Sequence, residues 1–78
     1  MDKKLITIIN EWNPMDIHPL IVDEYAYEIK RIQTSFNRDL HNAYDFGEIM
    51  QRIFIDSFGD RFSKSLEECI EVAKYYFI

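Results

Sequence analysis

Two histidines are the side chains of this 78-residue sequence that are best suited to acid–base or metal chemistry near neutral pH. His18 lies two residues after Asp16, and His41 lies two residues after Asp39. A histidine and an aspartate at this spacing can chelate a metal ion, but a zinc site needs three or four converging ligands. A metal- or ligand-binding protein would therefore need His18, His41 and Asp39 to meet from two separate segments. We keep this hypothesis as the alternative to a protein-binding role.

The single cysteine, Cys69, lacks the surroundings of a catalytic nucleophile. No histidine lies within helical reach of it, and the nearby carboxylates of Glu68 and Glu71 would raise rather than lower its pKa. The only glycines, Gly47 and Gly59, are too few for a phosphate-binding loop. The sequence therefore predicts a non-enzymatic protein with no catalytic residue and no cofactor.

Apolar residues recur at helical spacing in four segments, and no long alternating strand pattern appears. Asp45 with Glu48, and Ser65 with Glu68, match the spacing of the capping box that opens a helix. The length suits one domain, and 47% apolar residues are enough for a core. We predict an all-α fold, a compact four-helix domain over residues 1–78, with helices at about 3–12, 22–36, 46–58 and 65–77.

The stretch Glu11–Ile17, where the first predicted helix ends and the connection to the second begins, contains the only tryptophan and one of the two prolines. Pro14 ends the first helix, because the residue before a proline disfavours the α conformation. Pro19 suits the first turn of the next helix, where its missing N–H has no cost. We expect a structural turn of Trp12, Asn13 and Pro14 that packs against the start of the second helix.

The net charge of −5 disfavours nucleic-acid binding, which needs a basic surface. No apolar run approaches the roughly 20 residues that span a bilayer, and the N-terminal segment is too short for a secretory signal. With one cysteine, the sequence predicts a cytoplasmic protein without a disulfide. The acidic residues are densest around the second helix start, which gives a candidate interaction face for a basic partner: Asp16, Asp23, Glu24, Tyr27 and Glu28.

Large apolar residues exceed what the four inward helix faces need. The inward stripes hold Leu5, Ile8, Ile9 and Trp12; Val22, Tyr25, Ile29, Ile32 and Phe36; Phe46, Ile49, Met50, Ile53, Phe54 and Phe58; and Leu66, Cys69, Ile70, Ala73, Tyr76 and Phe77. Outside them remain Ile6, Ile21, Tyr27, Tyr44, Ile55, Val72 and Tyr75. If these residues are contiguous, they form an association surface. We expect a protein–protein interaction module that binds another protein or forms a homodimer. In a more specific version, it is an immunity or antitoxin-like protein that masks a basic active site.

Several of these residues together resemble the YugE-like family, small helical proteins of unknown function from bacilli and related bacteria. The family pattern is a first helix that ends in tryptophan and proline, then a tyrosine in an acidic helix start, an aromatic helix and a cysteine-bearing last helix. The matching residues are Glu11-Trp12-Asn13-Pro14, Asp23-Glu24-Tyr25, Glu28-Ile29, Phe54 to Phe58 and Leu66-Glu67-Glu68-Cys69. Asn13 stands where aspartate is commoner, and Met15-Asp16 where a small residue often follows. The resemblance covers nearly the whole chain and implies an all-helical fold with no assigned activity.

Overall fold

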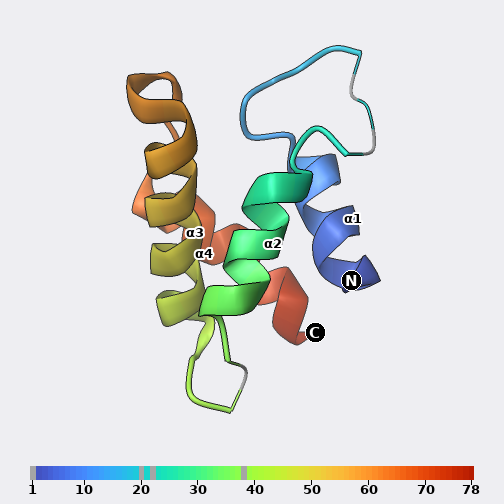
Figure 1. Ribbon diagram of the computed structural model, residues 1–78. Helices are drawn as coiled ribbons and strands as arrows, with labels where there is room; N and C mark the ends of the chain where they lie inside the picture. The colour runs from blue at the N-terminus through green and yellow to red at the C-terminus, as the bar shows by residue number, and fades with distance from the viewer. Residues whose placement is uncertain (1, 20, 22, 38) are drawn as a thin grey trace.

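A computed structural model describes residues 2–19, 21, 23–37 and 39–78 of the chain and folds them into four α-helices (Figure 1). The helices are α1 (Lys3–Trp12), α2 (Ala26–Ser35), α3 (Ala43–Phe58) and α4 (Leu66–Lys74), and the short 3₁₀ turns η1 (Gly59–Arg61) and η2 (Tyr75–Phe77) extend the last two. No strand occurs in this described part of the chain. The predicted all-α, four-helix fold is therefore confirmed.

The helix α3 has the most extensive packing, against α4 on one side and α2 on another. The helix α1 contacts α2 and η2, so it lies at the outside of this three-helix arrangement. The α3–α4 contact is close because Gly47 faces Ile70: a Cβ placed on Gly47 would lie 2.9 Å from the Ile70 Cα. A glycine within a helix reduces the stability of that helix. Here it allows α4 to approach α3 closely.

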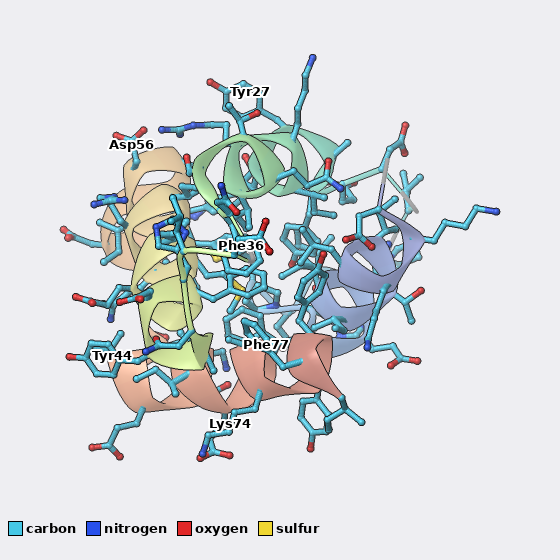
Figure 2. The ribbon with its side chains drawn as sticks, turned by 90° about the horizontal axis from the view of Figure 1, so that it is seen from below. Tyr27, Phe36, Tyr44, Asp56, Lys74 and Phe77 are labelled. Carbon is cyan, nitrogen blue, oxygen red and sulfur yellow. The ribbon has the colours of Figure 1, made fainter. Side chains whose placement is uncertain are left out.

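Aromatic rings fill the core in two groups, one toward each end of α3. The first group surrounds Phe54, whose ring contacts Trp12, Tyr25, Phe58 and Phe62 at centroid distances of 5.3 to 6.1 Å. In the second group Phe36 stacks on Phe46 at 4.1 Å and meets Tyr76 and Phe77 edge-on. Figure 2 shows Phe36 and Phe77 pointing inward, whereas Tyr27, Tyr44, Asp56 and Lys74 point outward. Edge-to-face and offset contacts of this kind add to the stability from apolar burial.

The helix α1 begins at the predicted residue because Asp2 caps it. The Asp2 carboxylate accepts hydrogen bonds from the Lys4 and Leu5 amides at 3.0 and 3.2 Å and from the Tyr76 hydroxyl. Burial alone would raise the pKa of Asp2, but the Tyr76, Leu5 and Lys4 hydrogen bonds lower it below the ordinary value. One ionised side chain therefore both caps α1 and joins it to η2.

The start of α2 differs from the prediction. Position 22, the predicted first residue, lies outside the described residues, and the α-helix begins at Ala26 after a turn at 23–25. The sequence had suggested that Pro19 occupies the first turn of this helix. In the structure Pro19 belongs to the connection instead. Tyr25 precedes the helix with φ −103° and ψ 15°, and its hydroxyl is hydrogen-bonded to Asn13 and Met15.

The start of α3 also differs, and here the prediction of residue 46 was wrong. The Asn42 side chain accepts from the Asp45 amide at 2.9 Å, while the Asp45 carboxylate accepts from the Asn42 amide at 3.3 Å. Asp45 is thus the third helical residue of a capping box and does not open one with Glu48. The end at Gly59, with φ 61°, is as predicted, and so is the Ser65 cap of α4.

Candidate functional site

Asn13, one of the three residues predicted as a structural turn, is hydrogen-bonded to Tyr25. Asn13 ends α1 in the left-handed conformation, with φ 47°, and its Oδ1 accepts from the Tyr25 hydroxyl at 2.6 Å and from the Ile17 amide at 3.1 Å. The Tyr25 hydroxyl in turn accepts from the Met15 amide at 3.1 Å. Pro14 is buried beside them. The turn thus contacts the residue that precedes α2.

Trp12 connects α1 to two other elements. Its indole Nε1 donates to the Glu68 Oε2 on α4 at 2.9 Å, and its ring meets Phe54 and Phe62 edge-on at 5.9 and 6.2 Å. Trp12 is half-buried: its ring packs against the core and is also partly exposed at the surface.

The predicted acidic interaction face is divided in the structure. Asp16, Asp23 and Glu24 are exposed, but Glu28 is buried with 6% exposure and so cannot contribute to an exposed surface. Tyr27 is exposed, yet its neighbours are basic: the Arg31 Cζ lies 5.7 Å from the Tyr27 ring centre. The five residues therefore do not form one acidic face.

A shallow hollow on α2 has the opposite charge from the one predicted there. Tyr27, Lys30 and Arg31 line it together with Thr34 and Ser35. Arg31 is also bound across the helix pair, because its Nη1 lies 2.8 Å from the Asp56 carboxylate on α3. This ion pair joins α2 to α3 at the surface and leaves Lys30 as the cation of the hollow with no ion pair among the described residues.

The histidines do not converge. His18 is exposed, and its Nε2 lies 2.7 Å from the Oδ1 of its near neighbour Asp16. His41 accepts a hydrogen bond from the Asn37 amide at 2.9 Å and stacks on Phe36, while Asp39 is exposed in the same loop. The loops that carry His18 and His41 leave opposite ends of α2 (Figure 1). Within the residues that the structure describes, no three His, Cys, Asp or Glu side chains are grouped as a metal site.

Cys69 is a core residue, as the sequence suggested. It is fully buried, and burial, with a smaller contribution from Glu68, raises its pKa to about 12. The folded protein therefore keeps the thiol protonated where an ordinary thiol, of pKa 9.0, would ionise.

We expect Cys69 in the native protein to react with a thiol reagent such as Ellman's reagent at least about a hundredfold more slowly than in denaturant, because the thiolate is the reactive species. The raised pKa also has a consequence for stability: above pH 9 the unfolded chain releases a proton that the folded chain retains, so stability falls as pH rises. A stopped-flow absorbance assay with and without denaturant measures the first effect. Rapid reaction of the native protein would contradict this buried, protonated thiol.

An open groove lies between α1 and α4, and we call it the α1–α4 groove. It has a volume of about 340 Å³, and its lining residues are Ile8, Glu11, Trp12, Val72 and Tyr75. Tyr75 is 61% exposed, whereas Val72 and Trp12 are only partly so. The groove exists because α1 packs on α2 and η2 while α4 packs on α3, so side chains alone bridge α1 and α4 at this point.

The two walls of the groove are antiparallel. Near the end of α1, Trp12 bonds to Glu68 at the start of α4, and near the start of α1, Lys4 Nζ donates to the carbonyl of Ile78 beyond the end of α4. Glu11 therefore lines the groove near the end of α1 where Trp12 bonds to Glu68, and Lys4 lies toward the opposite end of α1. The sequence had assigned Ile8 and Trp12 to the inward stripe and left Val72 and Tyr75 outside it; only the antiparallel placement brings the four together.

The arrangement suits binding of apolar groups. The groove presents apolar side chains and the carboxylate of Glu11, and its lining includes neither histidine nor Cys69. Pockets of this size, lined mainly by apolar and aromatic side chains with a few polar groups, are typical of binding sites.

No protein-family model, curated protein or solved structure matches this chain. The resemblance to YugE-like proteins therefore stays a prediction from the residues quoted above. Throughout the described part of the chain, none of the helices has both the length and the apolar character needed to cross a membrane.

Proposed function

We propose that this protein is a non-enzymatic protein–protein interaction module of the cytoplasm. The observation that carries the proposal is the α1–α4 groove, where Ile8, Trp12, Val72 and Tyr75 remain open although the core behind them is complete. Tryptophan and tyrosine are enriched at protein interfaces, because they bury a large apolar area and keep one polar group for a hydrogen bond.

The polar end of Trp12 supports this role. Its Nε1 is already bonded to Glu68, so covering the groove would leave no unpaired indole N–H. The buried Cys69 is consistent with a reducing compartment, where a lone thiol needs no partner. Tyr75 is the most exposed of the apolar and aromatic residues that line the groove and is the natural anchor for a partner.

The proposal is tested by comparing two exposed tyrosines. Tyr75→Ala removes a groove wall, whereas Tyr44→Ala removes a tyrosine of similar exposure, 52%, on the outer side of α3 (Figure 2). We expect the wild type and Tyr44→Ala to retain the same stoichiometric protein from a native extract, and Tyr75→Ala to bind it at least about tenfold more weakly.

Quantitative mass spectrometry of the captured protein, with light scattering of the purified chain, makes the measurement. Circular dichroism of both variants controls for folding. Equal retention by Tyr75→Ala and Tyr44→Ala would overturn the groove as the binding surface. If the wild type and Tyr44→Ala have twice the mass of one chain in light scattering and Tyr75→Ala has the mass of one chain, the partner is a second copy.

A further inference from the structure

We infer that the α1–α4 groove binds a basic amphipathic helix of a partner protein; this inference rests on the proposed function and specifies its partner. Three observations lead to it: the charge at one end of the groove, the short apolar segment that α1 contributes, and the helical walls.

The charge at one end of the groove is negative and incompletely neutralised. Glu11 lines the groove, and the ion pairs between described residues do not include it. The Glu68 carboxylate is held in place by Trp12 Nε1 at 2.9 Å, but its nearest cation, Lys64 Nζ, is 3.9 Å away. Glu11 is thus available to a cation from outside. Glu68, fixed by the groove's own tryptophan, has the longest of the ion pairs between described residues.

The apolar residues that α1 contributes to the groove, Ile8 and Trp12, match one turn of an anchoring helix. Ile8 and Trp12 are four positions apart in α1, which corresponds to about 6 Å along the helix axis. A partner helix would place an apolar side chain between Val72 and Ile8. A lysine or arginine three or four positions away would then lie on the same face of that helix, within reach of Glu11 and Glu68.

The helical walls favour a helix over an extended peptide. An extended peptide gains affinity by adding to a sheet edge, and the described residues contain no strand to offer one. Two antiparallel helices with a gap between them instead accept a third helix by side-chain packing. A second copy of this chain is disfavoured as occupant, because each copy has a net charge of −5.

The only tryptophan of the chain lies in the groove wall, so its fluorescence reports on the groove directly. The probes are two synthetic, tryptophan-free amphipathic peptides of the same length and apolar pattern, one of leucine and lysine and the other of leucine and glutamate. Each is titrated into the full chain, and into the variants Glu11→Lys and Glu48→Lys. The second variant makes the same charge change at an exposed position on α3, outside the groove.

We expect the leucine–lysine peptide to change the Trp12 emission saturably at one-to-one stoichiometry, and the leucine–glutamate peptide to cause no change. Glu11→Lys should weaken binding about tenfold, whereas Glu48→Lys should stay within about twofold of wild type. Added salt should weaken the interaction, because the contributing charges are near the surface.

Equal binding of the two peptides, or equal effects of the two charge reversals, would overturn the basic-helix inference. If the partner retained from extract still depends on Tyr75 in that case, the proposed function stands and only the partner class is wrong. If neither peptide binds, and Tyr75→Ala retains the captured protein as well as the wild type does, both proposals fail. A doubled mass in light scattering that depends on Tyr75 would assign the groove to a second copy and overturn the inference.

Discussion

Gly47→Ala is expected to lower the free energy of unfolding by about 2 kcal/mol, which is a large part of the stability of a domain this small. The new Cβ would lie 2.6 Å from the Ile70 Cγ1 and 2.9 Å from both the Cα and the amide nitrogen of Ile70. A side chain can rotate away from such a contact, but backbone atoms cannot, so α4 must move away from α3. The overpacking cost of up to about 3 kcal/mol is reduced by roughly 1 kcal/mol, because alanine favours the helix more than glycine.

Denaturant titration followed by circular dichroism measures this change. The adjacent variant Glu48→Ala is the control, since Glu48 is exposed on the same helix and its change should stay within about 0.5 kcal/mol. Unchanged stability of Gly47→Ala would mean that the two helices are not in backbone contact at this point.

Tyr25→Phe is expected to cost about 1–3 kcal/mol of stability although it removes one oxygen atom. The hydroxyl donates to Asn13 Oδ1 at 2.6 Å and accepts from the Met15 amide at 3.1 Å, in a fully buried residue. Phenylalanine would preserve the ring contact with Phe54 but leave the Met15 N–H without this acceptor. The loss therefore falls on the turn that connects α1 to α2.

The same variant should also change the response to alkali. Burial, with the nearby carboxylates of Glu24, Glu28 and Asp16, raises the pKa of Tyr25 above 10.0, while the Met15 amide opposes this. Above pH 10 the unfolded chain therefore loses a proton that the folded chain keeps, so wild-type stability falls as pH rises. Tyr25→Phe should lose this part of the alkaline decline. Tyr44→Phe, at an exposed site, is the control and should match wild type at every pH.

Helix existence was predictable because periodic apolar spacing is local, and the helix starts were less so because caps compete. Asn42-Asp45 and Asp45-Glu48 have the same spacing, and only the first is formed. For α2, the residue that precedes the helix is Tyr25, whose hydroxyl bonds to Asn13 and Met15, residues that the helical pattern does not include. Boundaries set by contacts across the fold cannot be read from one segment at a time.

The candidate site was predictable only in part. Val72 and Tyr75 were identified as surplus apolar residues, but whether they form a surface depends on α1 lying antiparallel to α4. Glu28 was placed on an exposed face from its charge, and the structure buries it at 6% exposure. Local patterns identify the side chains that a helix leaves over; the packing of other helices decides which of them meet.

The contacts of Asp2 with Tyr76 and of Lys4 with Ile78 each join residues 74 positions apart, and the two marked chain ends in Figure 1 lie close together. The start of α1 and the residues around η2 therefore lie side by side. Docking of α1 onto η2 brings together residues far apart in the sequence. Because closing a long loop has an entropic cost, we expect this docking to follow the local pairing of α3 with α4 in folding. A circular permutant that links residue 78 to residue 2 and opens between the exposed Asp39 and Leu40 would keep all four helices intact and make that docking local.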